Sequence, residues 1–179
     1  MRLQDKVIIV TGSTMGIGKA IARRCVREGA RVVIHGLEKD CGEELQEELG
    51  RKKAVLQIED ITNPGAPERL VLTALDAFGQ LDAVVNNAAK VSPSDIATTD
   101  RNFLSDIFRV NSFAPFLLIK QALPHLRESA GNVLNIGSVN AWSGEPNLLA
   151  YSMSKGALMT MTRNLGDVLM REHGVRVNA

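Results

Sequence analysis

Tyr151 is the single tyrosine of the chain, and Lys155 follows it four residues later. Residues at this spacing lie on the same face of a helix, so a phenol and an ammonium would be neighbours. An ammonium beside a phenol favours the ionised form of a group that ordinarily titrates at about pH 10. Such a phenol can pass a proton to or from a substrate oxygen. The pair predicts acid–base chemistry, although a packed ring beside a solvated amine has the same spacing.

A glycine-rich turn lies near the start of the chain. Residues 7–10 are apolar and β-branched, which is typical of a buried parallel strand, and helical apolar spacing begins at Ile17. Between them stand Gly12, Gly16 and Gly18, which let the backbone approach a pyrophosphate at a helix N-terminus. The spacing G-x-x-x-G-x-G differs from the G-x-G-x-x-G fingerprint and from a P-loop.

Further strands are expected at residues 31–34, 54–59, 81–85, 132–138 and 175–177, with helical patterns between them. One helix begins at Tyr151, and Pro115 and Pro124 predict local bends or breaks in the helical region before it. The alternation predicts an α/β fold: a Rossmann-type, doubly wound parallel sheet in three layers, formed by one domain over residues 1–179.

Several polar or small residues follow the predicted strands directly. They are Gly12, Asp60, Asn87 and Ser138, with Tyr151 one loop later. Ligands of such sheets lie beyond the carboxyl ends of the strands, so these residues are expected around one crevice. Asp60 fits an adenine contact and a cap for the next helix equally well.

The end of the second strand carries no clear sign of cofactor preference. Gly36 is neither a ribose-binding acid nor an arginine, and neither Met15 nor Leu37 is basic. Glu38 and Lys39 are expected as solvated charges. The choice between NAD and NADP therefore stays open.

Composition argues against several partners. The formal net charge is +1 and no dense basic run occurs, so neither nucleic acid nor an anionic membrane surface is expected. No apolar run is long enough to cross a bilayer, and the first residues do not form a signal peptide. Cys25 and Cys41 match no metal or redox spacing, which predicts reduced packing residues in a cytoplasmic protein without a bound metal.

Five motifs occur in a characteristic order: Thr11-Gly12-x-x-x-Gly16-Ile17-Gly18, Asn86-Asn87-Ala88, Asn111, Ser138 and Tyr151-x-x-x-Lys155. Together with the position of Ser138, thirteen residues before Tyr151, this order resembles the short-chain dehydrogenase/reductase family. The resemblance extends from Lys6 to Ala179.

The resemblance implies hydride transfer between NAD or NADP and a small carbonyl or alcohol substrate. Tyr151 would be the acid/base, Lys155 would favour the ionised phenol and hold the nicotinamide ribose, and Ser138 would bind the reacting oxygen. Asn111 would kink its helix and anchor a water leading protons to Lys155. The implied cofactor contacts are Gly12, Gly16, Ile17 and Gly18 at the pyrophosphate, Asp60 and Ile61 at the adenine, and Asn87 and Ala88 at the adjacent ribose.

Two departures from the family pattern stand out. Ala89 replaces a usual glycine, and its methyl group would crowd the cofactor or require an unfavourable backbone angle. Family members also continue past the position of Ala179 through a seventh strand and a substrate-covering segment, so we expect the natural polypeptide to be longer.

The family also implies a homo-oligomer paired through the helices that carry Asn111 and Tyr151. The apolar residues of the second helix, among them Leu158, Met161 and Leu165, predict an exposed apolar face. An alternative function is a non-catalytic dinucleotide-binding or interaction subunit. Trp142, four residues after Ser138, is expected either beside the pocket or as a buried anchor of its loop.

Overall fold

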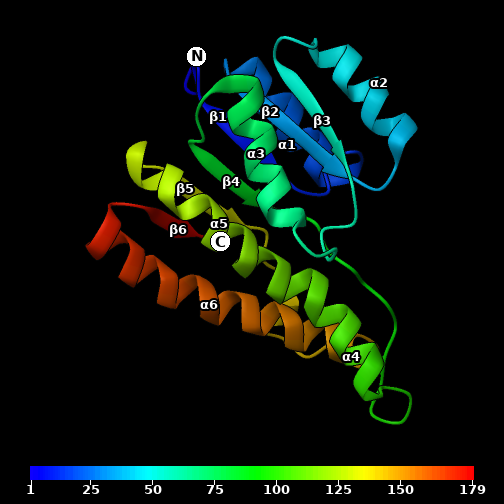
Figure 1. Cartoon of the computed structure of the whole chain (residues 1–179). Coiled ribbons are helices and arrows are strands. Elements are labelled where there is room, and N and C mark those ends of the chain that lie inside the picture. The colour runs from blue at the N-terminus through cyan, green and yellow to red at the C-terminus, as the bar shows by residue number, and fades with distance from the viewer.

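The computed structural model describes all 179 residues and contains one six-stranded parallel sheet in the order β3-β2-β1-β4-β5-β6 (Figure 1). The strands are β1 Val7–Val10, β2 Arg31–Gly36, β3 Ala54–Ile58, β4 Ala83–Asn86, β5 Asn132–Asn135 and β6 Arg176–Asn178. The helices are α1 Gly16–Arg27, α2 Lys39–Leu49, α3 Ala66–Phe78, α4 Arg101–Phe108, α5 Ala114–Glu128 and α6 Leu149–His173. This strand order is that of the Rossmann fold, and the predicted architecture is confirmed.

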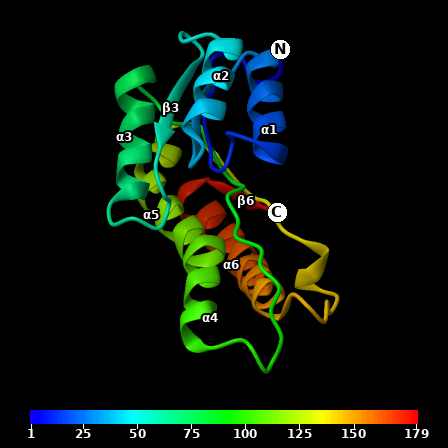
Figure 2. The ribbon, with the colours of Figure 1, turned by 90° about the vertical axis from the view of Figure 1, so that its right-hand side faces the viewer.

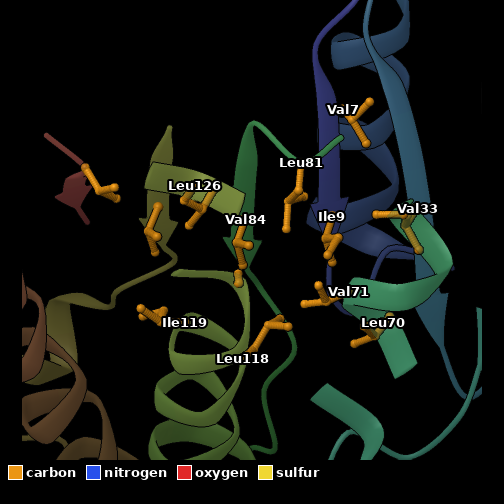
Figure 3. Packing of buried hydrophobic residues seen from close by; sticks show 14 of the residues in the cluster. Val7, Ile9, Val33, Leu70, Val71, Leu81, Val84, Leu118, Ile119 and Leu126 are labelled. Atoms are coloured by element: carbon orange, nitrogen blue, oxygen red, sulfur yellow. The ribbon is translucent and has the colours of Figure 1, made fainter. Parts of the chain in front are cut away.

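Alternating residues of the central strands face two separate cores. Val7, Ile9 and Val33 point toward α3 and α5 and belong to the larger buried cluster (Figure 3). Their neighbours Ile8 and Val10 pack with residues of α1 and α2 on the opposite face. Figure 2 shows α1 and α2 on one side of the sheet and α3 and α5 on the other. Both faces of β1 are thus buried, which explains its uninterrupted apolar sequence.

The predicted strand ends needed correction at the edge that carries the site. β5 ends at Asn135 rather than at Ser138, and β3 ends at Ile58 rather than at Glu59. After β5, Ser138 begins a short 3₁₀ turn, Val139–Ala141, and its hydroxyl accepts a hydrogen bond from the Asn140 amide. This local bond takes the chain away from strand geometry.

The helical region before β5 changes its winding once. Between α4 and α5, residues Arg109–Phe113 form a π-helical turn, and Pro115 follows in the first turn of α5. Proline has no N–H to continue an α-helical ladder, so the predicted irregularity beside Pro115 is present. Of the bend or break predicted at Pro124, a break is excluded, because α5 continues to Glu128. Pro124 is exposed, so the carbonyl that lost its donor lies on the solvent side.

The residues predicted to form an exposed apolar face on α6 are not exposed. Leu158 is buried, and Met161 and Leu165 pack against the larger core. Three exposed apolar side chains lie on the neighbouring π turn and α5, namely Phe113, Phe116 and Leu117, and three others lie on α6, namely Met153, Val168 and Met170. None of the helices is both long enough and apolar enough to cross a bilayer.

Candidate active site

The glycine-rich turn and the segment after β4 meet where the sheet order changes direction, between β1 and β4. The Thr11 hydroxyl accepts hydrogen bonds from the amides of Asn87 and Ala88, both at 3.0 Å. In return, the Asn87 side-chain amide donates to the carbonyls of Thr11 and Gly12, both at 2.9 Å. These reciprocal bonds fix two strand ends that lack ladder partners beyond the sheet. Such a switch point is where a doubly wound sheet opens a ligand crevice.

Two properties of the turn require glycine. Gly12 and Gly16 have φ angles of +60° and +55°, in the left-handed region that favours glycine. A Cβ on Gly18 would lie 2.2 Å from the Gly12 carbonyl oxygen, so α1 could not approach β1 so closely with any other residue. The first turn of α1 contains no acidic residue and no side-chain cap, which leaves its N–H groups available to an anion. The turn therefore fits a pyrophosphate.

A cleft of about 760 Å³ lies beside this turn. It is bordered by six of the residues predicted to bind the cofactor, namely Gly12, Ile17, Asp60, Ile61, Asn87 and Ala88. Gly16 and Gly18 shape the turn without bordering the cleft, and Tyr151 and Lys155 lie outside its lining.

Asp60 caps a turn rather than a helix. Its carboxylate accepts from the Thr62 amide and the Thr62 hydroxyl, both at 2.8 Å, and the amide bond in particular lowers the carboxyl pKa. The residue at the start of α3 is Gly65, so the helix-capping alternative was wrong. Asp60 is exposed at the edge of the cleft and retains a free carboxylate oxygen.

Tyr151 and Lys155 lie on one face of α6, as their spacing predicted. The Lys155 ammonium is 5.8 Å from the centre of the Tyr151 ring and donates a 2.6 Å hydrogen bond to the Ile136 carbonyl. This bond joins α6 to the segment between β5 and Ser138. Lys155 is 2% exposed, and burial lowers its pKa to about 8. The segment that carries the Ser138 hydroxyl is thus held against the helix of the tyrosine and the lysine.

Asn111 lies within the π turn and makes three side-chain hydrogen bonds. Its Oδ1 accepts from the Lys90 amide at 2.7 Å, and its Nδ2 donates to the Lys90 carbonyl and to the Ser154 hydroxyl, both at 2.9 Å. It therefore joins the chain after β4 to α6, one residue before Lys155. π turns occur often at functional sites, and this one places the Asn111 side chain between the segment after β4 and α6.

The concern about the backbone of Ala89 was unfounded. The residues other than glycine that have positive φ angles are Asp5 and Ala130. Ala89 therefore needs no conformation that an alanine avoids, and it borders the cleft.

The sequence interpretation missed Glu38, which was expected as a solvated charge. The residue is half-buried and borders the cleft, and its carboxylate accepts a 2.6 Å hydrogen bond from the Thr14 hydroxyl. This bond lowers the carboxyl pKa, so the group is charged at neutral pH. Its position immediately before α2, where acidic side chains favour the helix terminus, was the signal available.

Trp142 is not the buried loop anchor that was one of its two predicted roles. The side chain is 69% exposed, stacks 5.2 Å from the Arg163 guanidinium on α6, and does not border the cleft. A cation–π contact, rather than burial, fixes the loop there.

Comparison with known proteins identifies the family. The sequence profile described as short chain dehydrogenase matches residues 6–179. The chain is 40% identical to L-fucose dehydrogenase of Mus musculus over 178 residues, which cover 99% of this chain and 64% of that protein. It is 36% identical to NADPH-dependent aldehyde reductase 1, chloroplastic, of Arabidopsis thaliana over 187 residues, again 99% of this chain and 64% of that protein.

A solved structure agrees with these relatives. The 3-ketoacyl-(acyl-carrier-protein) reductase from Brucella melitensis, complexed with NADH, superimposes with a TM-score of 0.92 at 30% identity over 98% of this chain and 74% of that one. The chain belongs to the short-chain dehydrogenase family, and the family prediction is confirmed. It spans about 64% of the length of the curated relatives described above.

Proposed function

We propose that this chain carries out NAD(P)-dependent oxidation or reduction at a carbon–oxygen centre. The observation that carries the proposal is the Tyr151–Lys155 pair, with the ammonium buried and fixed to the Ile136 carbonyl beside the strand that leads to Ser138. The cleft at the glycine-rich turn supports a dinucleotide as the cofactor, and the NADH-bound reductase of similar structure supports a nicotinamide. Residues 1–179 would act as one NAD(P)-binding domain.

Each catalytic residue has a task that its contacts allow. Tyr151 would move a proton to or from the substrate oxygen, and Ser138 would hold that oxygen by a hydrogen bond. Lys155 would stabilise the ionised phenol and hold the nicotinamide ribose. Asn111 would keep the chain after β4 in register with α6 through its bonds to Lys90 and Ser154, and anchor a water on the proton path. The nicotinamide, when bound, supplies or accepts the hydride.

Glu38 favours NAD over NADP. A carboxylate at the border of the cleft after β2 suits a ribose hydroxyl and repels a 2′-phosphate. NADH should therefore bind more tightly than NADPH, and Glu38→Gln should narrow that difference about tenfold, since it removes one charge. Titrations of both cofactors on both proteins measure this, and an unchanged ratio would exclude Glu38 as the discriminating group.

The relatives favour an enzyme over a non-catalytic subunit, because they bear the names of dehydrogenases and reductases. Their names include a sugar dehydrogenase and an aldehyde reductase. We therefore propose sugars and small aldehydes as the first carbonyl or alcohol compounds to test.

The function is tested with the Tyr151→Phe variant, which removes one oxygen atom. After a screen of sugars and aldehydes has found a substrate, turnover should fall at least about a thousandfold, while the dissociation constant for NADH changes little. Comparable turnover in both proteins would reject Tyr151 as the acid/base. A wild-type protein that binds NADH without any turnover would favour the non-catalytic alternative.

We also propose a cytoplasmic homo-oligomer. Phe113 of the π turn, which packs against α6, forms an exposed apolar group with Phe116 and Leu117 of α5. Cys25 and Cys41 are free thiols on separate helices, as suits a reducing compartment. Sedimentation of the wild type and of Phe116→Glu tests the assembly: the charge should shift a dimer or tetramer toward smaller species, and two identical profiles would place the interface elsewhere.

A further inference from the structure

His35 lies at the end of β2 and contacts the glycine-rich turn three times. Its Nδ1 accepts a hydrogen bond from the Gly12 amide at 3.3 Å. Its carbonyl accepts from the Ser13 amide at 2.7 Å, and its own amide donates to the Ser13 hydroxyl at 3.1 Å. Two of these bonds use the backbone and are open to any residue. The bond to Gly12 depends on the imidazole.

The protonation state of this imidazole follows from its contacts. Nδ1 accepts a hydrogen bond from an amide, so the ring must be neutral with its proton on Nε2. Nε2 is buried and has no hydrogen-bond partner, and the charges nearest to the ring are Glu59 and Asp60 after β3. His35 is 2% exposed, and burial lowers its pKa to about 4 against the weaker opposing effects of those two residues. The neutral form that the Gly12 bond requires is thus the stable form at neutral pH.

We infer that His35 is a positioning residue for dinucleotide binding, because its Nδ1 holds the Gly12 amide and thereby keeps the turn in the conformation that faces the cleft. The inference rests on the proposed function, since it concerns the same cleft. Gly12 has a φ angle of +60° and borders the cleft, but a glycine readily adopts other backbone conformations. Without the Nδ1 acceptor, the amide of the half-buried Gly12 is left unsatisfied, and conformations that turn it toward water gain population. Affinity for the dinucleotide falls in proportion to the population that remains competent to bind.

Three substitutions separate the acceptor from the volume of the ring. His35→Asn places a carbonyl oxygen at the position of Nδ1, whereas His35→Gln places its amide at the position of Nε2. His35→Leu retains apolar volume with no acceptor. We expect His35→Leu and His35→Gln to bind NADH about tenfold more weakly than the wild type, and His35→Asn to bind within about threefold of it.

The measurements are the dissociation constant for NADH and the amide hydrogen exchange of Gly12, both at neutral pH. Exchange should be slow in the wild type and in His35→Asn and fast in the other two variants, even if their melting temperatures are alike. Equal NADH binding by His35→Leu and the wild type would overturn the inference. So would equal weakening in all three variants, which would mean that the ring acts by packing.

The exchange measurement also distinguishes the two hypotheses. A wild-type protein that fails to bind NADH would reject the proposed function, and Gly12 exchange would still report whether His35 controls the turn. If NADH binds well but Gly12 exchanges equally fast in the wild type and in His35→Leu, the proposed function stands and the role of His35 is rejected.

Discussion

The buried ammonium of Lys155 should make the folding stability of this protein depend on alkaline pH. Lys155 is 2% exposed, its hydrogen bond goes to the Ile136 carbonyl, and burial lowers its pKa from 10.5 to about 8. In the unfolded chain the side chain returns to its ordinary value. Between about pH 8 and pH 10.5 the unfolded state therefore binds more protons than the folded state, and stability rises with pH.

The magnitude follows from the difference between the two pKa values. Each pH unit of that difference is worth about 1.4 kcal/mol, so the charged lysine costs the folded state about 3 kcal/mol below pH 8. The cost disappears as the folded protein loses the proton. Lys155→Met removes the titrating group. Between about pH 8 and pH 10.5, the free energy of unfolding of the wild type should therefore rise by about 3 kcal/mol relative to that of the variant.

Urea unfolding at a series of pH values measures both curves, with Lys120→Met as the control for loss of an exposed lysine on α5. The control should follow the wild type, because its side chain is solvated in both states. The decisive quantity is the difference between the wild type and Lys155→Met. If this difference is the same at pH 7 as at pH 10.5, burying the charged Lys155 does not cost the folded state free energy. The description of the site as a buried ammonium would then be wrong.

Two further predictions concern the turn and the core. Gly18→Ala should weaken NADH binding at least about tenfold and destabilise the fold by about 2 kcal/mol, because the new methyl group would meet the Gly12 carbonyl. A binding titration and urea unfolding measure the two effects. A stable variant with unchanged NADH affinity would show that α1 can shift freely. Asp82→Ala should cost about 3 kcal/mol, since it leaves the buried Val7 amide without its acceptor. Burial raises the Asp82 pKa, but hydrogen bonds from Lys6 and Val7 outweigh this effect, and the net pKa is lowered. The stabilisation is therefore present above about pH 4 and is lost as the pH falls. Acid unfolding that follows the same curve in the wild type and in Asp82→Ala would contradict this prediction.

The fold could be predicted because its strands are buried on both faces. β1 consists of β-branched residues alone, and β2 has three in succession, Val32, Val33 and Ile34, while the segments between the strands repeat apolar residues at helical spacing. The ends of strands were less predictable, since they depend on local hydrogen bonds. The strand predicted over residues 132–138 stops at Asn135, because the contacts of Ser138 with Asn140 and of Lys155 with Ile136 direct residues 136–138 into a turn.

The candidate site shows the same division between patterned residues and residues defined by long-range contacts. Tyr151, Lys155 and the three glycines stand at fixed spacings within one element, so local geometry predicted their placement. Glu38 and His35 have no such spacing. Glu38 is defined by its bond with the Thr14 hydroxyl and His35 by its bond with the Gly12 amide, and both partners lie in the turn that follows β1. A charged residue just outside a strand and a histidine within it are ordinary in isolation. The roles proposed for them depend on the parallel pairing of β1 with β2, which brings the end of one strand beside the turn that follows the other. Residues that adjust cofactor binding are therefore to be sought at the ends of neighbouring strands, where sequence separation hides the contact.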